Sequence, residues 1–257
     1  MAKIKSVLTK LKPGWGLVPI IAFLLIWEVV ARLNWVPGQF HFPAFSEVVR
    51  EFVNLSSTGV LGDNFAASLL RVMVGLIAGS MAGMVLGVIM GWNEIAHKAL
   101  NPLISLFLPI PPLGWLPLLM LWVGINNWLP ITIIFISSFF PILYNTVAGI
   151  KSIDKDYVKV SRTLGASDFK ILTTVVMPLA LPIIFTGLRL NAGQAWRVVI
   201  AAEMVAIPTG IGALMLRAES LIRIDIIIVC LIVLAVMTYI FDKIFGYFER
   251  RVTARWY

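Results

Sequence analysis

Charged side chains interrupt several long apolar stretches of the chain, and these residues could do chemistry. They are Arg71, Arg189, Arg197 and Glu203. A charge inside a membrane-spanning segment is costly, so each is a candidate for contact with an ion or a substrate. A guanidinium offers paired donors to a nitrate, sulfonate or carboxylate oxygen, and we regard Arg197 and the adjacent Trp196 as possible pathway residues.

Structural roles are open for the same residues. Arg71 stands near the end of its apolar stretch, where its side chain can reach a membrane interface. Arg189 and Glu203 can serve as partners of polar backbone groups as readily as of a substrate, and Glu203 is kept as a possible pathway residue. Trp115 is a further pathway candidate, although helix packing and interface anchoring suit Trp115 and Trp122 better than ligand binding does.

Signatures of catalysis are absent from the sequence. It has no G-x-x-x-x-G-K-[ST], no Gly-Lys dipeptide, no His-Glu-x-x-His and no Gly-x-Ser-x-Gly, and His41 and His97 stand in different loops. We therefore predict no catalytic residue, no metal site and no cofactor site in this chain. Any energy from ATP must come from another polypeptide. The single cysteine, Cys230, excludes internal disulfides and suits packing.

The longest charged segment between apolar runs covers residues 151–178. A helical period places Tyr157, Val160, Ser161 and Leu164 on one face. Lys155, Lys159 and Arg162 point elsewhere. This pattern is typical of a short helix that docks into a groove of another protein.

Capping residues bound this helix. Asp154 can cap its start, and Gly165 can end it because glycine adopts the left-handed conformation without a steric penalty. Ser167 or Asp168 can then cap a second helix, which we expect to run to Pro178.

Composition identifies an integral membrane protein that is all-α. Hydrophobic residues make up 60% of the chain, charged residues 13%, and the mean hydropathy is +0.93. A span needs about 20 mostly apolar residues to cross about 30 Å of hydrocarbon. The sequence offers six such segments: 17–33, 69–92, 101–123, 128–149, 179–204 and 224–248. Pro109, Pro111, Pro112 and Pro117 in the third allow a broken or re-entrant segment instead.

The distribution of Lys and Arg predicts the orientation, because cytoplasmic loops are enriched in both. These residues gather before the first span, in the segment 151–170 and after the last span. Both termini and the charged segment are therefore expected in the cytoplasm of a multi-pass protein of the inner, or plasma, membrane. The net charge of +8 then reflects topology and attraction to anionic lipid, and nucleic-acid binding is a poor interpretation.

We divide the chain accordingly into a cytoplasmic N-terminus (1–16), a first helix with an outer amphipathic segment (17–68), a core transmembrane domain (69–248) that includes the coupling loop 151–178, and a C-terminal tail (249–257).

Glycines recur at every fourth position from Gly75 to Gly91. Such a stripe of small residues lets helices approach closely in lipid. The partner can be a helix of the same subunit, or the stripe can form a subunit or sliding interface.

The charged segment resembles the cytoplasmic "EAA" loop of type I ABC importer permeases, which is Glu-Ala-Ala, three residues, Gly, nine residues, then Ile-x-Leu-Pro. Gly165 and the run Val175 to Pro178 keep this spacing, whereas the triplet reads Lys159, Val160, Ser161. In that family the loop forms a coupling helix that seats in a cleft of the ATPase. The resemblance implies that residues 154–170, with Tyr157, Leu164, Ala166 and peripheral Lys159 and Arg162, contact an ATPase subunit.

Further motifs occur in family order between Leu69 and the end, and they are similar to those of nitrate, sulfonate, taurine and bicarbonate permeases. They include Pro111-Pro112-Leu113-Gly114-Trp115-Leu116-Pro117, Thr186-Gly187-Leu188-Arg189, Trp196, Ala201-Ala202-Glu203 and Arg255-Trp256. The resemblance implies a MetI-like fold with a five-helix core, a homodimer, two ATPase subunits that bind ATP and Mg, and an external binding protein. It favours taurine or sulfonate slightly over nitrate or bicarbonate.

Two other classes of protein remain possible from the residues alone. A secondary transporter or channel that needs no ATPase would carry an inverted repeat and charged midplane sites, and no clear internal repeat is visible. A membrane anchor for a soluble complex would also need a docking loop. ATP-dependent uptake, ATP-independent flux or no transport distinguishes the three.

Overall fold

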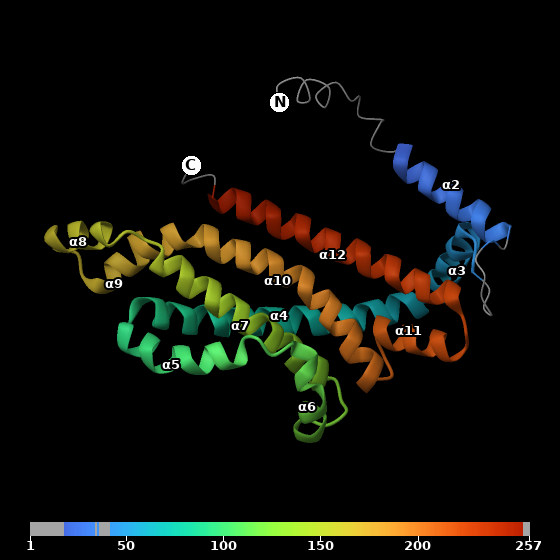
Figure 1. Cartoon of the computed structure of the whole chain (residues 1–257), viewed down its shortest axis with the longest axis horizontal. Helices are drawn as coiled ribbons and strands as arrows, with labels where there is room; N and C mark the ends of the chain where they lie inside the picture. Colours follow the sequence, from blue (N-terminus) through green and yellow to red (C-terminus); the bar gives the residue numbers. More distant parts are fainter. Residues whose placement is uncertain (1–17, 34, 36–41, 254–257) are drawn as a thin grey trace. The chain divides into compact units, whose positions relative to one another are not determined.

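Helices form all of the regular structure that is described, which confirms the all-α prediction. The computed structural model describes residues 18–33, 35 and 42–253, and no strand occurs within these ranges. Figure 1 labels the helices. They belong to two units. One contains Met1–Leu61 and Arg217–Val229, and the other contains Gly62–Leu216 and Cys230–Tyr257. The N-terminal lysines, His41 and the Arg255-Trp256 pair lie outside the described residues.

The first unit contains α2 (Val18–Arg32) and α3 (Phe45–Ser57). The Trp27 ring lies 5.5 Å from the Phe45 ring, and the Glu28 carboxylate accepts hydrogen bonds from the backbone N–H and the hydroxyl of Ser46. These contacts hold the two helices together. The 15 described residues of α2 extend about 22 Å at 1.5 Å per residue, which is less than the hydrocarbon core. The predicted first span is therefore not among the full-length spans described below.

Four helical stretches are long and apolar enough to cross a membrane. They are Val60–Trp92, Trp128–Lys151, Asp168–Val205 and Ile224–Val252. The helices concerned are α4 (Val60–Trp92), α7 (Trp128–Lys151), α10 (Met177–Ala206) and α12 (Ile224–Thr253). They coincide with the predicted spans 69–92, 128–149, 179–204 and 224–248.

The third predicted span, 101–123, is wrong as a single straight helix. The chain forms α5 (Glu94–Phe107), then a 3₁₀ turn, η1 (Pro112–Trp115), that leads into α6 (Leu116–Trp122). The two parts meet at 86°, so they form a broken span or a re-entrant loop. Proline lacks a backbone N–H and disfavours a helical conformation in the residue before it, and Pro109, Pro111 and Pro112 stand at this break.

The helix expected to end at Pro178 continues through it instead. Residues from Asp168 onward form α9 (Asp168–Ile171), a π-helical turn (Leu172–Val176) and then α10. In this turn the N–H of Met177 donates to the carbonyl of Leu172, five residues earlier. The wider turn accommodates a proline ring without ending the helix. Helix α9, at the end of the charged segment, is thus joined to α10 by unbroken helix.

The glycine stripe of α4 faces α7 within the second unit. A Cβ atom added at Gly79 would lie 2.5 Å from the carbonyl oxygen of Phe135, and one at Gly83 would lie 2.5 Å from that of Phe139. Gly75, Gly87 and Gly91 have similar close neighbours on α7. The stripe therefore serves a helix contact inside one chain, the first of the two alternatives, and its glycines are not available to a second subunit.

A strained residue ends α11 (Ile211–Ser220). Ile222 has φ +57°, and its N–H and that of Arg223 donate to the carbonyls of Glu219 and Ala218, the pattern of a C-terminal cap that usually contains glycine. A β-branched residue pays about 1–2 kcal/mol for the left-handed conformation. Ile222 is also exposed, so little burial is lost on truncation.

We therefore expect Ile222→Gly to raise the free energy of unfolding by about 1 kcal/mol. The measurement is thermal denaturation in detergent, followed by tryptophan fluorescence. Leu221→Gly is the matched control because Leu221 is equally exposed but lacks a positive φ, and this variant should be destabilised. A lower midpoint for Ile222→Gly would contradict the assignment of strain.

Candidate functional site

The charged segment forms the helix that its caps predict. Helix α8 spans Lys155–Thr163, and the Asp154 side chain accepts a hydrogen bond from the N–H of Asp156. Gly165 has φ +82°, and its N–H donates to the carbonyl of Arg162. The N–H of Ala166 donates to the carbonyl of Ser161, which completes the cap. Ser167 rather than Asp168 caps α9, where it accepts from the N–H of Lys170.

Apolar side chains on α8 and just after it are exposed to solvent. Tyr157 is 58% exposed, Val160 59% and Leu164 83%. Ser161 does not share this exposure, because it is half-buried and its hydroxyl donates to the carbonyl of Tyr157. The exposed apolar surface of α8 and its C-terminal cap therefore consists of Tyr157, Val160 and Leu164.

The opposite side of α8 anchors it to the membrane helices. Val158 and Ala166 pack against a buried cluster that includes Ile150 from α7, Ile171 from α9 and Ala180 from α10. The backbone of the docking segment is thus held by three other elements. Its exposed face cannot turn inward without breaking this packing.

The basic residues of the segment pair locally. Lys159 lies 2.8 Å from Asp156, and Arg162 lies 2.9 Å from Asp168 on α9. All four side chains are well exposed, so the pairs contribute little to stability. Lys159 and Arg162 lie at the edge of the apolar surface. Acidic groups of a partner protein can therefore replace Asp156 and Asp168 as their ion-pair partners.

Sequence reasoning missed Phe169. Its side chain is 76% exposed on α9, close to the cap at Ser167. The sequence did contain a signal for Phe169, because it is a large aromatic residue in an otherwise charged, polar segment. Aromatic side chains are enriched in the buried centres of protein interfaces.

The four possible pathway residues do not come together. Trp196 is buried, with its ring stacked 6.1 Å from Phe65 and edge-on to Phe241 at 5.4 Å. Trp115 is half-buried in η1 beside Phe107. Glu203 is fully buried. Of the four, Arg197 is the one that lines the pocket described below, and the other three have positions that suit packing or structural pairing.

A buried polar cluster surrounds Glu203. Its carboxylate lies 2.6 Å from the Arg71 guanidinium and accepts hydrogen bonds from the Ser68 hydroxyl and the Gly212 N–H. Arg71 also donates to Asn127 and to Thr209. The expectation that Arg71 reaches a membrane interface is wrong, since its side chain is only 4% exposed. The cluster joins α4, α10, the start of α11 and the residue before α7.

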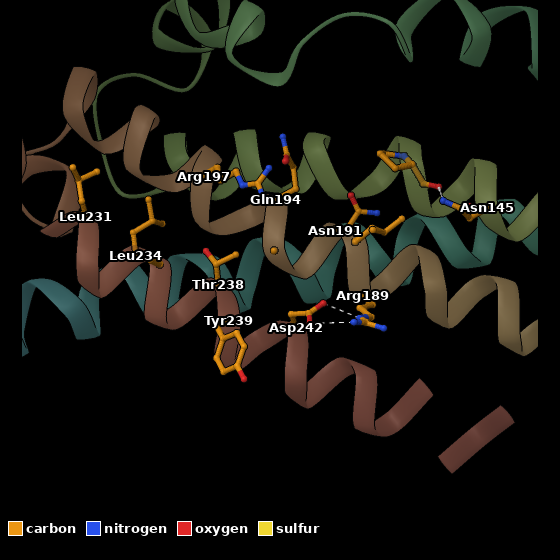
Figure 2. Close-up of a pocket in the computed structure, with 14 residues that line it drawn as sticks. Asn145, Arg189, Asn191, Gln194, Arg197, Leu231, Leu234, Thr238, Tyr239 and Asp242 are labelled. Atoms are coloured by element: carbon orange, nitrogen blue, oxygen red, sulfur yellow. Dashed lines mark hydrogen bonds and ion pairs between the residues drawn. The ribbon is translucent and has the colours of Figure 1, made fainter. Parts of the chain in front are cut away.

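The pocket that contains Arg197 has a volume of about 840 Å³ and lies between α7, α10 and α12. Figure 2 shows Arg197 and Gln194 beside each other on α10, with Leu231 and Leu234 toward one end and the Arg189–Asp242 pair toward the other. Arg189 donates to both carboxylate oxygens of Asp242 and also lies 3.1 Å from Glu249. Two acids on α12 thus neutralise Arg189.

Comparison with known proteins finds one family and many relatives. The family described as "binding-protein-dependent transport system inner membrane component" matches residues 75–254. A putative ABC transporter permease of Methanocaldococcus jannaschii is 37% identical over 231 residues, which cover 88% of this chain and 86% of that protein. The taurine transport system permease TauC of Escherichia coli is 30% identical over 239 residues, 91% of this chain and 86% of that protein.

A solved structure shares the fold. It shows inward-facing conformations of the MetNI methionine ABC transporter and matches with a TM-score of 0.64 at 18% identity. The match covers 73% of this chain and 93% of the other chain. The helices of the core therefore have the MetI-like arrangement that the sequence predicted.

Proposed function

This chain belongs to the family of inner membrane components of binding-protein-dependent transport systems, and from that premise we propose how it works as an ABC importer permease. The proposal concerns the coupling to an ATPase, the partners and the solute. The subunit itself carries out transport rather than a chemical reaction, as its relatives do.

The exposed apolar surface of α8 carries the proposal. Tyr157, Val160 and Leu164 are uncovered within the described part of the chain, although they lie in a charged segment where apolar surface must face water. A short helix with one apolar face and paired charges at its edge fits a groove in a partner protein. We propose that this groove belongs to an ATPase subunit, with Leu164 and Tyr157 as the main anchors.

The helix that leads away from α8 supports a mechanical role. From Asp168 to Ala206 the chain is continuous helix, and Arg197 of the pocket lies on it. Packed helices shift as units, so a displacement of α8 by a closing ATPase is passed into α10. This movement would turn the permease from inward-facing to outward-facing.

Partners follow from the family and from charge. We propose a homodimer with two ATPase subunits, which bind ATP and Mg, and an extracytoplasmic binding protein that delivers the solute. Basic residues in the docking segment, with those before the first span and after the last, support a cytoplasmic position for both termini. The solute is a small anion, with taurine or a sulfonate slightly favoured over nitrate or bicarbonate because of the motif from Pro111 to Pro117.

The test is a pull-down of an ATPase subunit by the detergent-solubilised chain. We expect Leu164→Asp to abolish retention, because a carboxylate would be desolvated in an apolar groove. Gly165→Trp should weaken it through the backbone, since a Cβ at Gly165 would meet nothing within 4 Å but a non-glycine residue cannot easily keep φ +82°.

Leu221→Asp is the matched control for this pull-down. Leu221 is 73% exposed just after α11. It lies between the last two predicted spans, in the segment 205–223, which the predicted topology places outside the cytoplasm. The same substitution there should leave ATPase retention unchanged. Equal retention by Leu164→Asp and the wild type would show that α8 is not the docking helix.

A further inference from the structure

The pocket between α7, α10 and α12 contains one arginine whose charge is not balanced. Arg197, Gln194 and Thr238 form no side-chain hydrogen bond or ion pair within residues 42–253. Arg189, by contrast, is paired with Asp242 and Glu249. The lining charges are Arg189, Arg197 and Asp242, and Glu249, the second partner of Arg189, brings the formal sum to zero. Both acids lie against Arg189, so the positive charge is local to Arg197.

The position of Arg197 along its helix makes an unpaired charge costly. Arg197 is nine residues, or about 14 Å, from the end of α10 at Ala206, and the whole helix is about 45 Å long. A hydrocarbon core of about 30 Å, centred on α10, would therefore contain the backbone of Arg197 about 6 Å inside its boundary. Arginine at such depth usually faces a water-filled path or meets an anion.

The donors around Arg197 suit an oxoanion. A guanidinium presents two parallel N–H groups, which match two oxygens of a sulfonate, carboxylate or nitrate group. The Gln194 amide lies one helical turn away on the same face of α10, and the Thr238 hydroxyl faces the same pocket from α12. These three groups can therefore contact one bound anion.

The rest of the lining suits an apolar body. Leu190, Leu231, Leu234 and Ala235 contribute aliphatic surface to the same pocket. Its volume of about 840 Å³ lies within the range of about 300–1,000 Å³ that is usual for organic ligands and far exceeds what an inorganic ion needs. The pocket combines one anion-binding end with aliphatic walls.

We propose that this pocket is a solute subsite of the permease itself, where Arg197 binds the oxoanion head of an organic anion and the leucines of α10 and α12 contact its aliphatic part. This inference rests on the proposed transport function. It adds that the permease discriminates among anions: an alkanesulfonate or alkyl carboxylate is retained better than nitrate or bicarbonate.

The first experiment measures the charge of the pocket without transport. The full chain with Cys230→Ala and Gln194→Cys is placed in nanodiscs of neutral lipid and treated with two thiol reagents, the anionic sulfonatoethyl and the cationic trimethylammonioethyl methanethiosulfonate. We expect the anionic reagent to react faster. Adding Arg197→Gln should lower the anionic-to-cationic rate ratio at least about tenfold, because one unit charge nearby is lost.

Arg250→Gln is the matched control, because Arg250 lies on α12 outside the pocket and this variant removes the same charge. It should leave the rate ratio unchanged. Failure of both reagents to modify the thiol introduced at position 194, in folded protein that reacts fully in denaturant, would show that lipid or another subunit fills the pocket, and the proposal would be wrong. An equal ratio with and without Arg197 would also overturn it.

A protection experiment tests the apolar part of the site. At equal concentration, 1-butanesulfonate should slow the reaction of the introduced thiol with the anionic reagent more than methanesulfonate or nitrate does. Equal protection by all three would contradict a site for organic anions. If the rate ratio depends on Arg197 but the wild type retains no ATPase and takes up no solute, the subsite stands and the proposed function fails.

Discussion

Replacing Glu203 by Gln is expected to lower the free energy of unfolding by about 3–5 kcal/mol, the usual cost of removing one partner from a buried ion pair. The Glu203 carboxylate is fully buried and lies 2.6 Å from a guanidinium that is itself almost inaccessible. The neutral amide leaves the charge of Arg71 without a counter-ion in a region that water does not reach. The midpoint of thermal unfolding in detergent measures the loss.

The geometry of the cluster explains why the amide is a poor replacement. Glu203 accepts from the Ser68 hydroxyl, the Gly212 N–H and Arg71, so both of its oxygens serve as acceptors. An amide has only one oxygen, and its NH₂ group would face donors. A second cost therefore adds to the loss of charge, because donors that were paired become unpaired in a buried site.

A double variant separates charge balance from size. Arg71→Met with Glu203→Gln removes both charges, and we expect it to recover part of the stability that Glu203→Gln loses. Glu94→Gln is the surface control, since its pair with Lys98 is largely exposed and should matter by less than about 1 kcal/mol. The double variant could instead lose as much free energy of unfolding as Arg71→Met and Glu203→Gln lose when added together. That result would contradict the importance of the ion pair.

Gly79→Ala and Gly83→Ala are expected to destabilise the protein by about 1–3 kcal/mol each, the range for overpacked cores. The new methyl groups would lie 2.5 Å from the carbonyl oxygens of Phe135 and Phe139. Backbone oxygens of a neighbouring helix cannot rotate away as a side chain can, so α4 and α7 must move apart. Thermal unfolding in detergent measures this effect as well.

Gly62→Ala on the same helix gives the opposite expectation. A Cβ at Gly62 would meet nothing within 4 Å, so alanine there gains helix propensity, at most about 1 kcal/mol, without a clash. The three variants make the same chemical change in α4, and they differ in whether α7 is adjacent. Destabilisation of all three would show that the effect is not contact with α7.

Local signals in the sequence determined the docking segment and four of the spans. Asp154, Gly165 and Ser167 cap helices through bonds to residues two to five positions away, so their roles depend on nearby sequence. The spans of α4, α7, α10 and α12 follow from apolar composition over about 20 residues. The ATPase-binding role of α8 stays a prediction.

Local signals left the helix breaks undecided. Three prolines end α5 and turn the chain by 86°, whereas Pro178 lies inside a continuous helix. A proline removes the same donor in both places. The outcome differs because a π-helical turn precedes Pro178 and because Val176 and Ala180 are packed into a buried cluster on either side of it. Packing and local register together decide whether a proline ends a helix.

Only the tertiary structure decided which charges are satisfied. Arg71 and Glu203 are 132 residues apart in sequence, and neither has a nearby residue that identifies its partner. Arg189 and Arg197 are eight residues apart on one helix, yet within the described residues α12 supplies carboxylates to the first and none to the second. Periodicity and capping act over a few residues, so sequence can specify them. The balance of a charge within an apolar helix depends on which distant helix packs against it, and that is fixed only when the chain has folded.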